Sequence, residues 1–339
     1  MIREALSRVV AGESLAENEA AAVMREILEG GATPVQIGGL AVALRMKGET
    51  VDEVVGLARA MRAAAIPFPD VPRPLVDTCG TGGDGSGTFN VSTAVAFVVA
   101  AGGGRVAKHG NRAVSSRAGS ADVLEALGAS VDVSPAEAAR MIREVGVAFL
   151  FAPSYHWAFK HAAEPRRDLG VRTVFNVLGP MCNPAGAERQ LVGVYDAGWV
   201  PRFAHVLARL GTDSAWIVHS DDGLDELSVF AYTRLARVAD GHVTEETVDP
   251  AKLGLAHPES ERGSVQGGDA KRNATLLEEA LSGKPGAARD LVLLNAGAAL
   301  AAARLAPDLP AGVARARELV DRGGAKAKLK QFLAFEPSR

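Results

Sequence analysis

The feature that most constrains the fold is an alternation of short β-rich runs with helical segments between residues 75 and 219. A capping-box sequence, Ser134-Pro-Ala-Glu137, opens one of the intervening helices. Strands that alternate with helices usually pair in parallel, with helices on both faces of the sheet. The sequence therefore predicts an α/β domain with a mostly parallel central sheet, whose strands cover residues 75–77, 105–107, 130–133, 147–151, 190–195 and 214–219.

The first 65 residues predict a separate group of helices. A hydroxyl residue precedes a Glu or Gln by three positions, as at helix N-termini, in Ser14-Leu-Ala-Glu17, Thr33-Pro-Val-Gln36 and Thr50-Val-Asp-Glu53. The segment 37–44 is apolar nearly all round, so it needs cover from other helices or from a second subunit. Four prolines within 67–74 mark a linker and a domain boundary. Residues 156–184 interrupt the alternation and are expected to return to these helices.

The composition excludes several classes of protein. The 37 Lys and Arg against 40 Asp and Glu give a net charge of −3, which leaves no basic surplus for a nucleic-acid backbone. Two cysteines, Cys79 and Cys182, are too few for a disulfide scaffold or a Cys-rich zinc site. The longest apolar runs, such as 94–101, fall short of the roughly 20 residues that span a membrane. We therefore expect a cytoplasmic protein in which any phosphate site is local.

A glycine-rich segment follows the first predicted strand. Five glycines fall within residues 80–87, and Asn90, Ser92 and Thr93 stand where the next helix begins, so backbone amides and side-chain donors can form an anion cradle. Gly80, Gly82 and Gly85 fit the dinucleotide pattern, but residues 85–121 contain no acid to bind a ribose, and no P-loop sequence occurs. The alternative is an ordinary strand-to-helix turn without a ligand.

The acid-free stretch carries a group of cations. The group consists of Arg105, Lys108, His109, Arg112 and Arg117. All except the histidine are permanently charged and have no acidic residue nearby in the sequence, which suits a polyanionic ligand. Ser115, Ser116 and Ser120 add hydroxyl donors to the same loop. The alternative is a solvated basic loop.

A cluster of carboxylates, Asp221-Asp222-Gly-Leu-Asp225-Glu226, follows the last predicted strand. On a strand-to-helix loop it suits Mg²⁺, which prefers oxygen ligands and bridges phosphate oxygens. The alternative is helix N-terminal charge that complements the macrodipole. Of the remaining candidates, His156 and His161 are expected to pack locally, and Arg166-Arg167 by itself indicates a surface ion pair.

Short motifs recur along nearly the whole chain: Asp77-Thr-Cys-Gly-Thr-Gly-Gly-Asp84, Phe89-Asn-Val-Ser-Thr93, Lys108-His-Gly-Asn-Arg112, 119–128, 172–180 with Asn183-Pro184, and Asp225-Glu-Leu-Ser228. Taken together, they resemble the motifs of anthranilate phosphoribosyltransferases over essentially the whole chain. The resemblance implies a homodimeric enzyme of tryptophan biosynthesis that uses Mg²⁺ and transfers the phosphoribosyl group of phosphoribosyl pyrophosphate (PRPP) to the amine of anthranilate. It implies the fold of pyrimidine nucleoside phosphorylases, with a small helical domain over 1–70 and part of 156–185, and a large α/β domain over 71–155 and 186–339.

The resemblance also implies roles for individual residues. PRPP is expected to bind at Gly80, Gly83, Asp84, Thr88, Asn90, Val91, Ser92, Thr93, Lys108, His109, Gly110, Asn111, Arg112, Ala113, Val114, Ser115, Ser116 and Ser120. Anthranilate is expected at Gly80, Asn111 and Arg166, and the metal at Ser92, Asp225 and Glu226. The family's proline lies two residues before its arginine, whereas Pro165 immediately precedes Arg166, so Arg167 stays open for that role.

The chemistry expected is positioning and leaving-group stabilisation by Lys108 and Arg112, with no covalent enzyme intermediate. Two alternatives remain open: a pyrimidine nucleoside phosphorylase of the same fold, and a non-catalytic relative that binds nucleic acid. The paired acids Asp225 and Glu226 speak against the phosphorylase, and the net charge of −3 speaks against the nucleic-acid binder.

Overall fold

The computed structural model describes residues 1–113 and 117–336. Its N-terminal part is a group of helices, and two of the expected capping boxes are present: the Gln36 and Glu53 amides donate to the hydroxyls of Thr33 and Thr50. The prediction at Ser14 is wrong, because the helix begins after Ala16, whose amide donates to Glu19 at 2.7 Å. The helices are α1 (Ile2–Val10), α2 (Glu17–Leu28), α3 (Pro34–Lys47) and α4 (Val51–Ala63).

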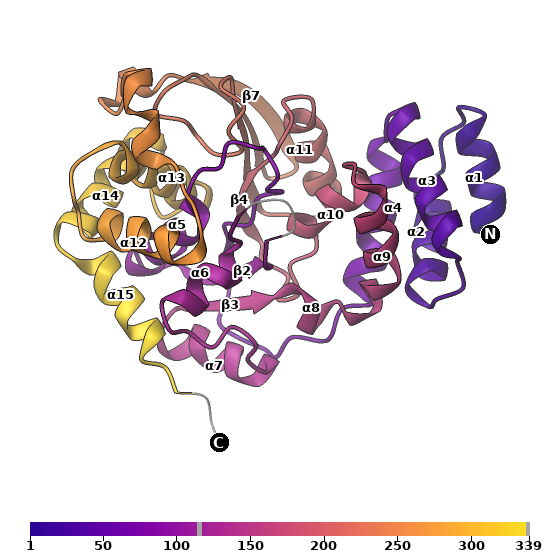
Figure 1. Cartoon of the computed structure of the whole chain (residues 1–339), viewed down its shortest axis with the longest axis horizontal. Helices are drawn as coiled ribbons and strands as arrows, with labels where there is room; N and C mark the ends of the chain where they lie inside the picture. Colours follow the sequence, from indigo (N-terminus) through magenta and orange to yellow (C-terminus); the bar gives the residue numbers. More distant parts are fainter. Residues whose placement is uncertain (114–116, 337–339) are drawn as a thin grey trace.

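Two later helices return to this group, as the sequence predicts. Figure 1 shows α9 (Lys160–Leu169) and α10 (Val174–Met181) beside α3 and α4, on the side of the molecule away from the C-terminus. They follow the short α8 (Ala152–Tyr155) and the single 3₁₀ turn η1 (Trp157–Phe159). Together with α1, these helices cover Ile37, Leu40, Ala41 and Leu44, which are buried within the chain, whereas Val42 and Ala43 are half-buried.

The α/β part is built on one sheet of seven strands in the order β3-β2-β1-β4-β5-β6-β7. The first five strands of the chain pair in parallel, which confirms the predicted mostly parallel sheet. The strands are β1 (Leu75–Asp77), β2 (Arg105–Gly110), β3 (Val147–Phe151), β4 (Arg189–Gly193), β5 (Ser214–Ser220), β6 (Thr233–Ala239) and β7 (His242–Val248).

Two strand assignments differ from the prediction. Residues 130–133 form no strand; Val131 and Val133 instead pack into the core from a loop. The antiparallel pair β6 and β7 was not predicted, although its two-residue turn Asp240-Gly241, with φ of 50° and 80°, is a strong hairpin sequence.

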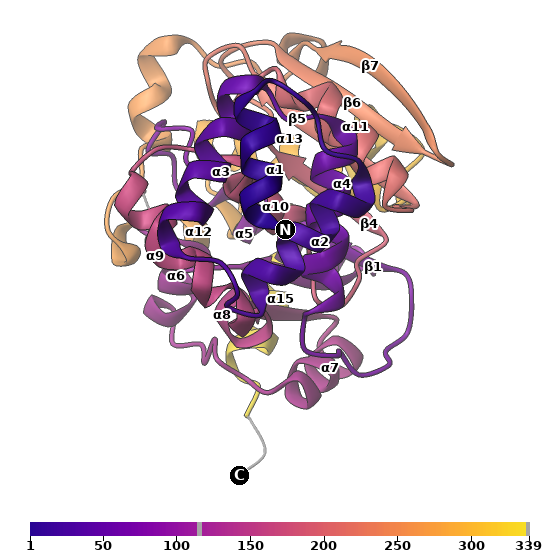
Figure 2. The same ribbon diagram turned by 90° about the vertical axis from the view of Figure 1, so that its right-hand side faces the viewer.

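The sheet separates two hydrophobic cores. Alternate residues of β5 point to opposite faces: Ala215 and Ile217 join the core under α11 (Trp199–Arg209), and Trp216 and Val218 join the core that contains α13 (Ala287–Ala302). Seen from the side of the N-terminal helices, those helices lie in front of the sheet and β7 is at its far edge (Figure 2). No helix in the described ranges is long and apolar enough to cross a membrane.

The remaining helices complete the α/β part. Helix α5 packs on β2 and against α13 and α15, and α12 packs against α5 and α6. Their bounds are α5 (Val91–Ala101), α6 (Ser120–Ala126), α7 (Pro135–Glu144), α12 (Ala270–Leu281), α14 (Leu309–Asp321) and α15 (Gly324–Leu333), with 3₁₀ segments η2 (Pro250–Leu253) and η3 (Glu259–Val265). Because β1, β2, β4 and β5 are parallel, the segments that follow them meet at one edge of the sheet.

Candidate active site

The glycine-rich segment joins β1 to α5 at this edge, as expected for an anion cradle. Four of its glycines have left-handed backbone conformations that residues with a Cβ rarely adopt: Gly82, Gly83, Gly85 and Gly87, with φ between 62° and 79°. Val91 begins α5 directly after the loop, so the free amides of the first helical turn adjoin it. The segment therefore offers backbone donors beside an electropositive helix end.

Contacts on both sides hold the cradle. On the sheet side, the Thr81 amide donates to Gly193 O at 2.8 Å, and the Tyr195 amide donates to the Thr81 hydroxyl at 3.0 Å. On the other side, Thr88 pairs with Gln266 in an antiparallel bridge, and the Gly267 amide donates to Gly87 O at 2.8 Å. The contribution of 265–267 was not predicted, because only the tertiary fold brings that segment to the loop.

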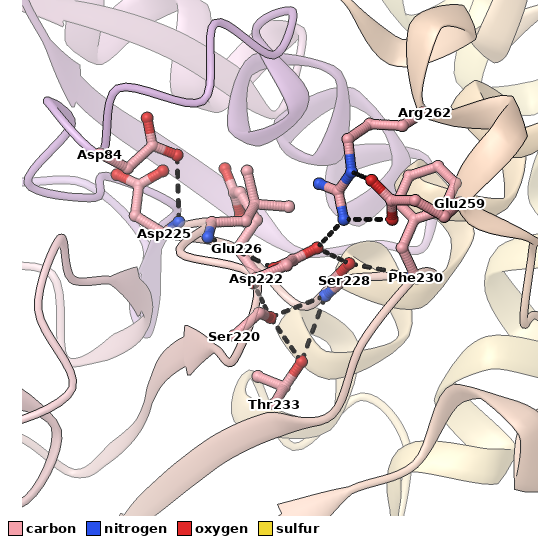
Figure 3. Close-up of polar contacts among 11 residues, drawn as sticks. Asp84, Ser220, Asp222, Asp225, Glu226, Ser228, Phe230, Thr233, Glu259 and Arg262 are labelled. Carbon is pink, nitrogen blue, oxygen red and sulfur yellow. Dashed lines mark hydrogen bonds and ion pairs between the residues drawn. The ribbon is translucent and has the colours of Figure 1, made fainter.

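The acidic loop 221–226 reaches the cradle. The Asp225 amide donates to Asp84 Oδ2 at 3.2 Å, so Asp84 joins Asp225 and Glu226 in one cluster of carboxylates, the acid cluster (Figure 3). The approach depends on Gly193, where a Cβ would lie 1.4 Å from Asp225 O. Asp84 was expected among the phosphate ligands, and its position beside the acids was not foreseen from the sequence.

The acid cluster carries more negative charge than its surroundings compensate. Burial raises the pKa of Glu226 to about 8, even though Lys108 works in the opposite direction. Burial also raises the pKa of Asp225, and the neighbouring Asp84 and Glu226 raise it further. A cation bound among these oxygen atoms would relieve both the desolvation and the repulsion.

Hydrogen bonds and an ion pair from β5, α13 and η3 hold the rest of the acidic loop. The Ser220 hydroxyl donates to Glu226 O at 2.7 Å, and the fully buried side chain of Asn295 bonds both the amide and the carbonyl of Leu227. Asp222 lies apart from the acid cluster, because it pairs with Arg262 at 2.8 Å and accepts from the Ser228 hydroxyl at 2.7 Å (Figure 3).

The sequence predicts that the acidic loop joins a strand to a helix, and this prediction is wrong: the loop joins β5 to the antiparallel β6. Because no helix follows, the alternative interpretation of these acids as partners of a helix macrodipole fails as well.

Lys108, within β2, connects the cradle to the acid cluster. Its side chain is buried, and Nζ donates to Thr78 O and to Ser92 Oγ, each at 3.3 Å. The Ser92 amide, like Lys108, lowers the pKa of Glu226 and therefore lies close to its carboxylate. The structure thus brings together Lys108, Ser92 and Glu226, which the sequence motifs assign to PRPP and to the metal.

The expectation that the cations face no counter-charge is wrong for two of them. Lys108 acts on Glu226, and Arg112 pairs with Glu125 and Asp122 of α6, at 2.7 Å and 3.4 Å. These two acids stand just beyond the acid-free stretch. Arg105, Arg112 and Arg117 are all exposed, and the Arg112 guanidinium is directed at α6.

His109 contributes no positive charge to the site. Its ring is buried against His156, Nδ1 lies 3.2 Å from Gly179 O, and burial lowers its pKa to about 3. Atoms of Asp77, Cys79 and His109 that could bind a metal ion lie within 4.8 Å of one another. The Asp77 oxygens already accept from the His109 amide and from Asn183, however, so this carboxylate has a structural role.

The remaining assigned residues surround the cradle on the side of α6. The Thr93 hydroxyl donates to the Ser120 hydroxyl at 3.1 Å, and the Ala113 amide donates to Asp122. Asn111 is exposed, and its carbonyl accepts from the Ala121 amide. A Cβ at Gly110 would lie 2.6 Å from the ring of Phe149. Val114, Ser115 and Ser116 lie outside the described residues.

Arg166 lies in α9, the helix that packs against α2 and α3 of the N-terminal group. Its guanidinium stacks on the Phe159 ring at 5.3 Å, and burial lowers its pKa. Within residues 1–113 and 117–336 it makes no ion pair, so the surface ion pair expected at Arg166-Arg167 is formed by Arg167 alone. The neighbouring Arg167 is exposed and pairs with Asp168 at 3.4 Å.

Known families match both parts of the chain. A glycosyl transferase family, helical bundle domain, matches residues 3–65, and a glycosyl transferase family, a/b domain, matches residues 72–326. The anthranilate phosphoribosyltransferase of Thioalkalivibrio sulfidiphilus is 52% identical over 337 residues, which are 99% of each chain. That of Anaeromyxobacter sp. strain K is 53% identical over 98% of each chain.

Solved structures agree with these relatives. The crystal structure of anthranilate phosphoribosyltransferase from Thermus thermophilus is 44% identical, with a TM-score of 0.91 over 97% of this chain and 98% of that one. The Saccharomyces cerevisiae enzyme in complex with PRPP and Mg is 27% identical, with a TM-score of 0.85 over 98% of this chain and 96% of that one. The chain therefore belongs to the anthranilate phosphoribosyltransferase family.

Proposed function

We propose that this chain transfers the phosphoribosyl group of PRPP to the amine of anthranilate, with release of pyrophosphate, as a step of tryptophan biosynthesis. The observation that carries the proposal is the meeting of an amide-rich cradle with a buried acid cluster at one edge of the sheet. A magnesium polyphosphate needs donors for its oxygens and carboxylates for its metal, and both are present within one site. A pyrimidine nucleoside phosphorylase has no need of the acid cluster.

The acid cluster fits Mg²⁺. Asp225, Glu226 and the adjacent Ser92 offer oxygen ligands, and Asp84 stands against Asp225. Bound there, Mg²⁺ would neutralise charge on the carboxylates and on a pyrophosphate. The yeast relative in complex with PRPP and Mg supports this proposal.

The residues of this chain would act by binding and positioning. The bond that breaks joins ribose C1 to pyrophosphate, so negative charge grows on the leaving group. Lys108 and the amides of the cradle and of α5 would stabilise that charge more strongly in the transition state than in the ground state. Arg112 could assist only after leaving Glu125. An aryl amine is neutral at pH 7, so its attack needs no strong base.

We further propose that anthranilate binds between the cradle and α9, with Gly80, Asn111 and Arg166 in contact. The helical domain would then comprise 1–70 and part of 156–185, with the α/β domain over 71–155 and 186–339. The free guanidinium of Arg166 and its place on the helical side support this arrangement.

The purified protein tests the activity directly. Incubation with PRPP, Mg²⁺ and anthranilate should reduce anthranilate fluorescence and release one pyrophosphate for each anthranilate consumed. Omission of any one component should stop both changes. Unchanged fluorescence under all conditions would overturn the proposal.

We also propose a homodimer through the outer face of α3. Most apolar residues of 37–44, the segment expected at the interface, are covered within the chain: Ile37, Leu40, Ala41 and Leu44 are buried, and Val42 and Ala43 are half-buried. Val35 and Met46, however, are each 83% exposed. They stand three helical turns apart and therefore on one face of α3. Exposed apolar side chains on one face are typical of an interface.

A charge on this face should separate the subunits. Met46→Glu is expected to sediment as a monomer where the unmodified chain sediments as a dimer, because burying an unpaired carboxylate in an apolar contact is strongly unfavourable. Tyr232→Glu is the matched control, since Tyr232 is 54% exposed in the α/β part. The proposal would be contradicted if the Met46→Glu variant were dimeric or if the unmodified chain were monomeric.

A further inference from the structure

A chain of three hydrogen bonds crosses the outer side of the cradle. It begins at the Gly268 amide, which donates to Asn273 Oδ1 at 2.7 Å. Asn273 Nδ2 donates to Asn90 Oδ1 at 2.9 Å, and Asn90 Nδ2 donates to Ala118 O at 3.2 Å. Asn273 belongs to α12, which packs against both α5 and α6 (Figure 1). The residue itself is only 3% exposed.

The two ends of this chain fix its direction. A backbone amide can only donate, and a backbone carbonyl can only accept. Asn273 must therefore present its oxygen to Gly268 and its nitrogen to Asn90, and Asn90 must present its nitrogen to Ala118. Turning either side-chain amide over would set two acceptors, or two donors, against each other.

The direction matters because of where Asn90 stands. Asn90 precedes the first turn of α5, two residues before Ser92, and it is partly exposed. Its side-chain nitrogen carries two hydrogens, and Ala118 takes only one of them. The second has no partner among the described residues, so it remains a donor at the mouth of the cradle. With the amide turned over, an oxygen would stand in its place and oppose a phosphate.

We infer that Asn273 is a positioning residue for PRPP, which acts by fixing the side-chain amide of Asn90 with its nitrogen toward the phosphate site. This inference rests on the proposed function, because the ligand at the cradle is taken to be PRPP. Asn273 itself is buried and is not required to touch the ligand.

Two substitutions separate this role from a merely structural one. Asn273→Asp keeps the volume and the acceptor for Gly268, but it sets a carboxylate oxygen against Asn90 Oδ1. It therefore favours the turned-over amide, because a charge-assisted bond from Asn90 Nδ2 to the carboxylate outweighs the lost bond to Ala118 O. Asn273→Ala removes both hydrogen bonds but opposes neither orientation. A structural role makes Asn273→Ala the more damaging change, whereas positioning makes Asn273→Asp the more damaging change for PRPP.

The measurement is calorimetric binding of PRPP in the presence of Mg²⁺, with KM for anthranilate and thermal unfolding recorded alongside. Asn273→Asp should weaken PRPP binding by roughly ten- to a hundred-fold, the loss of one hydrogen bond to a charged group. Asn273→Ala should weaken it less, and KM for anthranilate should stay nearly unchanged in both variants. Equal affinities in Asn273→Asp and the unmodified chain, or a larger loss in Asn273→Ala, would overturn the inference.

A double-mutant cycle supplies the control. In an Asn90→Ala background, substitution of Asn273 should change PRPP affinity little, because the amide through which it acts is gone. If Asn273→Asp does not fold, the cycle with Asn273→Ala tests the same claim: undiminished loss in the Asn90→Ala background refutes it. An unmodified chain that binds no PRPP would instead refute the proposed function.

Discussion

Replacing Asp225 and Glu226 together by Asn and Gln should reduce turnover by roughly a hundred- to a thousand-fold or more, the scale of losing an electrostatic stabiliser of the transition state. Both carboxylates lie in the acid cluster, and Glu226 adjoins Lys108 and Ser92. The amides keep the shape of the side chains but lose the charge that would hold Mg²⁺. Initial rates at saturating PRPP, anthranilate and Mg²⁺ measure the loss.

The same variant should be at least as stable as the unmodified chain in metal-free buffer. The folded-state pKa of Glu226 is raised to about 8 from an ordinary value of 4.5, so its ionisation costs stability progressively as the pH rises from about 4.5 to 8. A glutamine carries no such penalty. The difference in Tm between variant and unmodified chain should therefore grow from pH 5 to pH 8, in favour of the variant.

Asp221→Asn is the matched control for this experiment. Asp221 belongs to the same loop, but it is half exposed and pairs with Arg234 at 3.4 Å. Its loss should leave both turnover and the effect of Mg²⁺ nearly unchanged. A fully active Asp225→Asn, Glu226→Gln variant would show that the acid cluster is not the metal site.

Arg166→Ala should raise KM for anthranilate by about ten- to a hundred-fold and change KM for PRPP much less. The expected loss is roughly 1.5–3 kcal/mol, that of a charge-assisted hydrogen bond. Anthranilate carries a carboxylate, and the guanidinium of Arg166 is free of ion pairs in the described part of the chain. Steady-state kinetics with each substrate varied in turn measure the two KM values.

Arg167→Ala is the control, because Arg167 is adjacent, exposed and paired with Asp168. It should leave KM for anthranilate unchanged. The reverse result, with Arg167→Ala impaired and Arg166→Ala normal, would mean that the neighbouring arginine binds the carboxylate. No effect in either variant would remove both arginines from the site.

The sequence predicts the parts of the fold that local patterns specify. The capping boxes at Thr33, Thr50 and Ser134 begin α3, α4 and α7 as expected. The strand predicted at 130–133 failed because alternating valines also suit a loop that packs on a core. The pair β6 and β7 was missed because β7 is largely exposed at the sheet edge and lacks a long apolar run.

At the site, the sequence indicates the residue types but not which of them meet. The glycine-rich segment, Lys108 and the acidic loop were identified, and their convergence follows from the parallel sheet. The pairing of Arg112 with Glu125, the place of Asp84 beside Asp225, and the chain through Asn273 depend on tertiary contacts between distant segments. No local spacing could have disclosed them.

The most direct test of the central claim is to locate the metal in a complex. Crystals grown with PRPP and Mn²⁺ in place of Mg²⁺ should show an anomalous peak in contact with the carboxylates of Asp225 and Glu226, with the pyrophosphate lying between that peak and the glycine-rich loop. A peak elsewhere, or a pyrophosphate bound away from residues 80–93, would contradict the account.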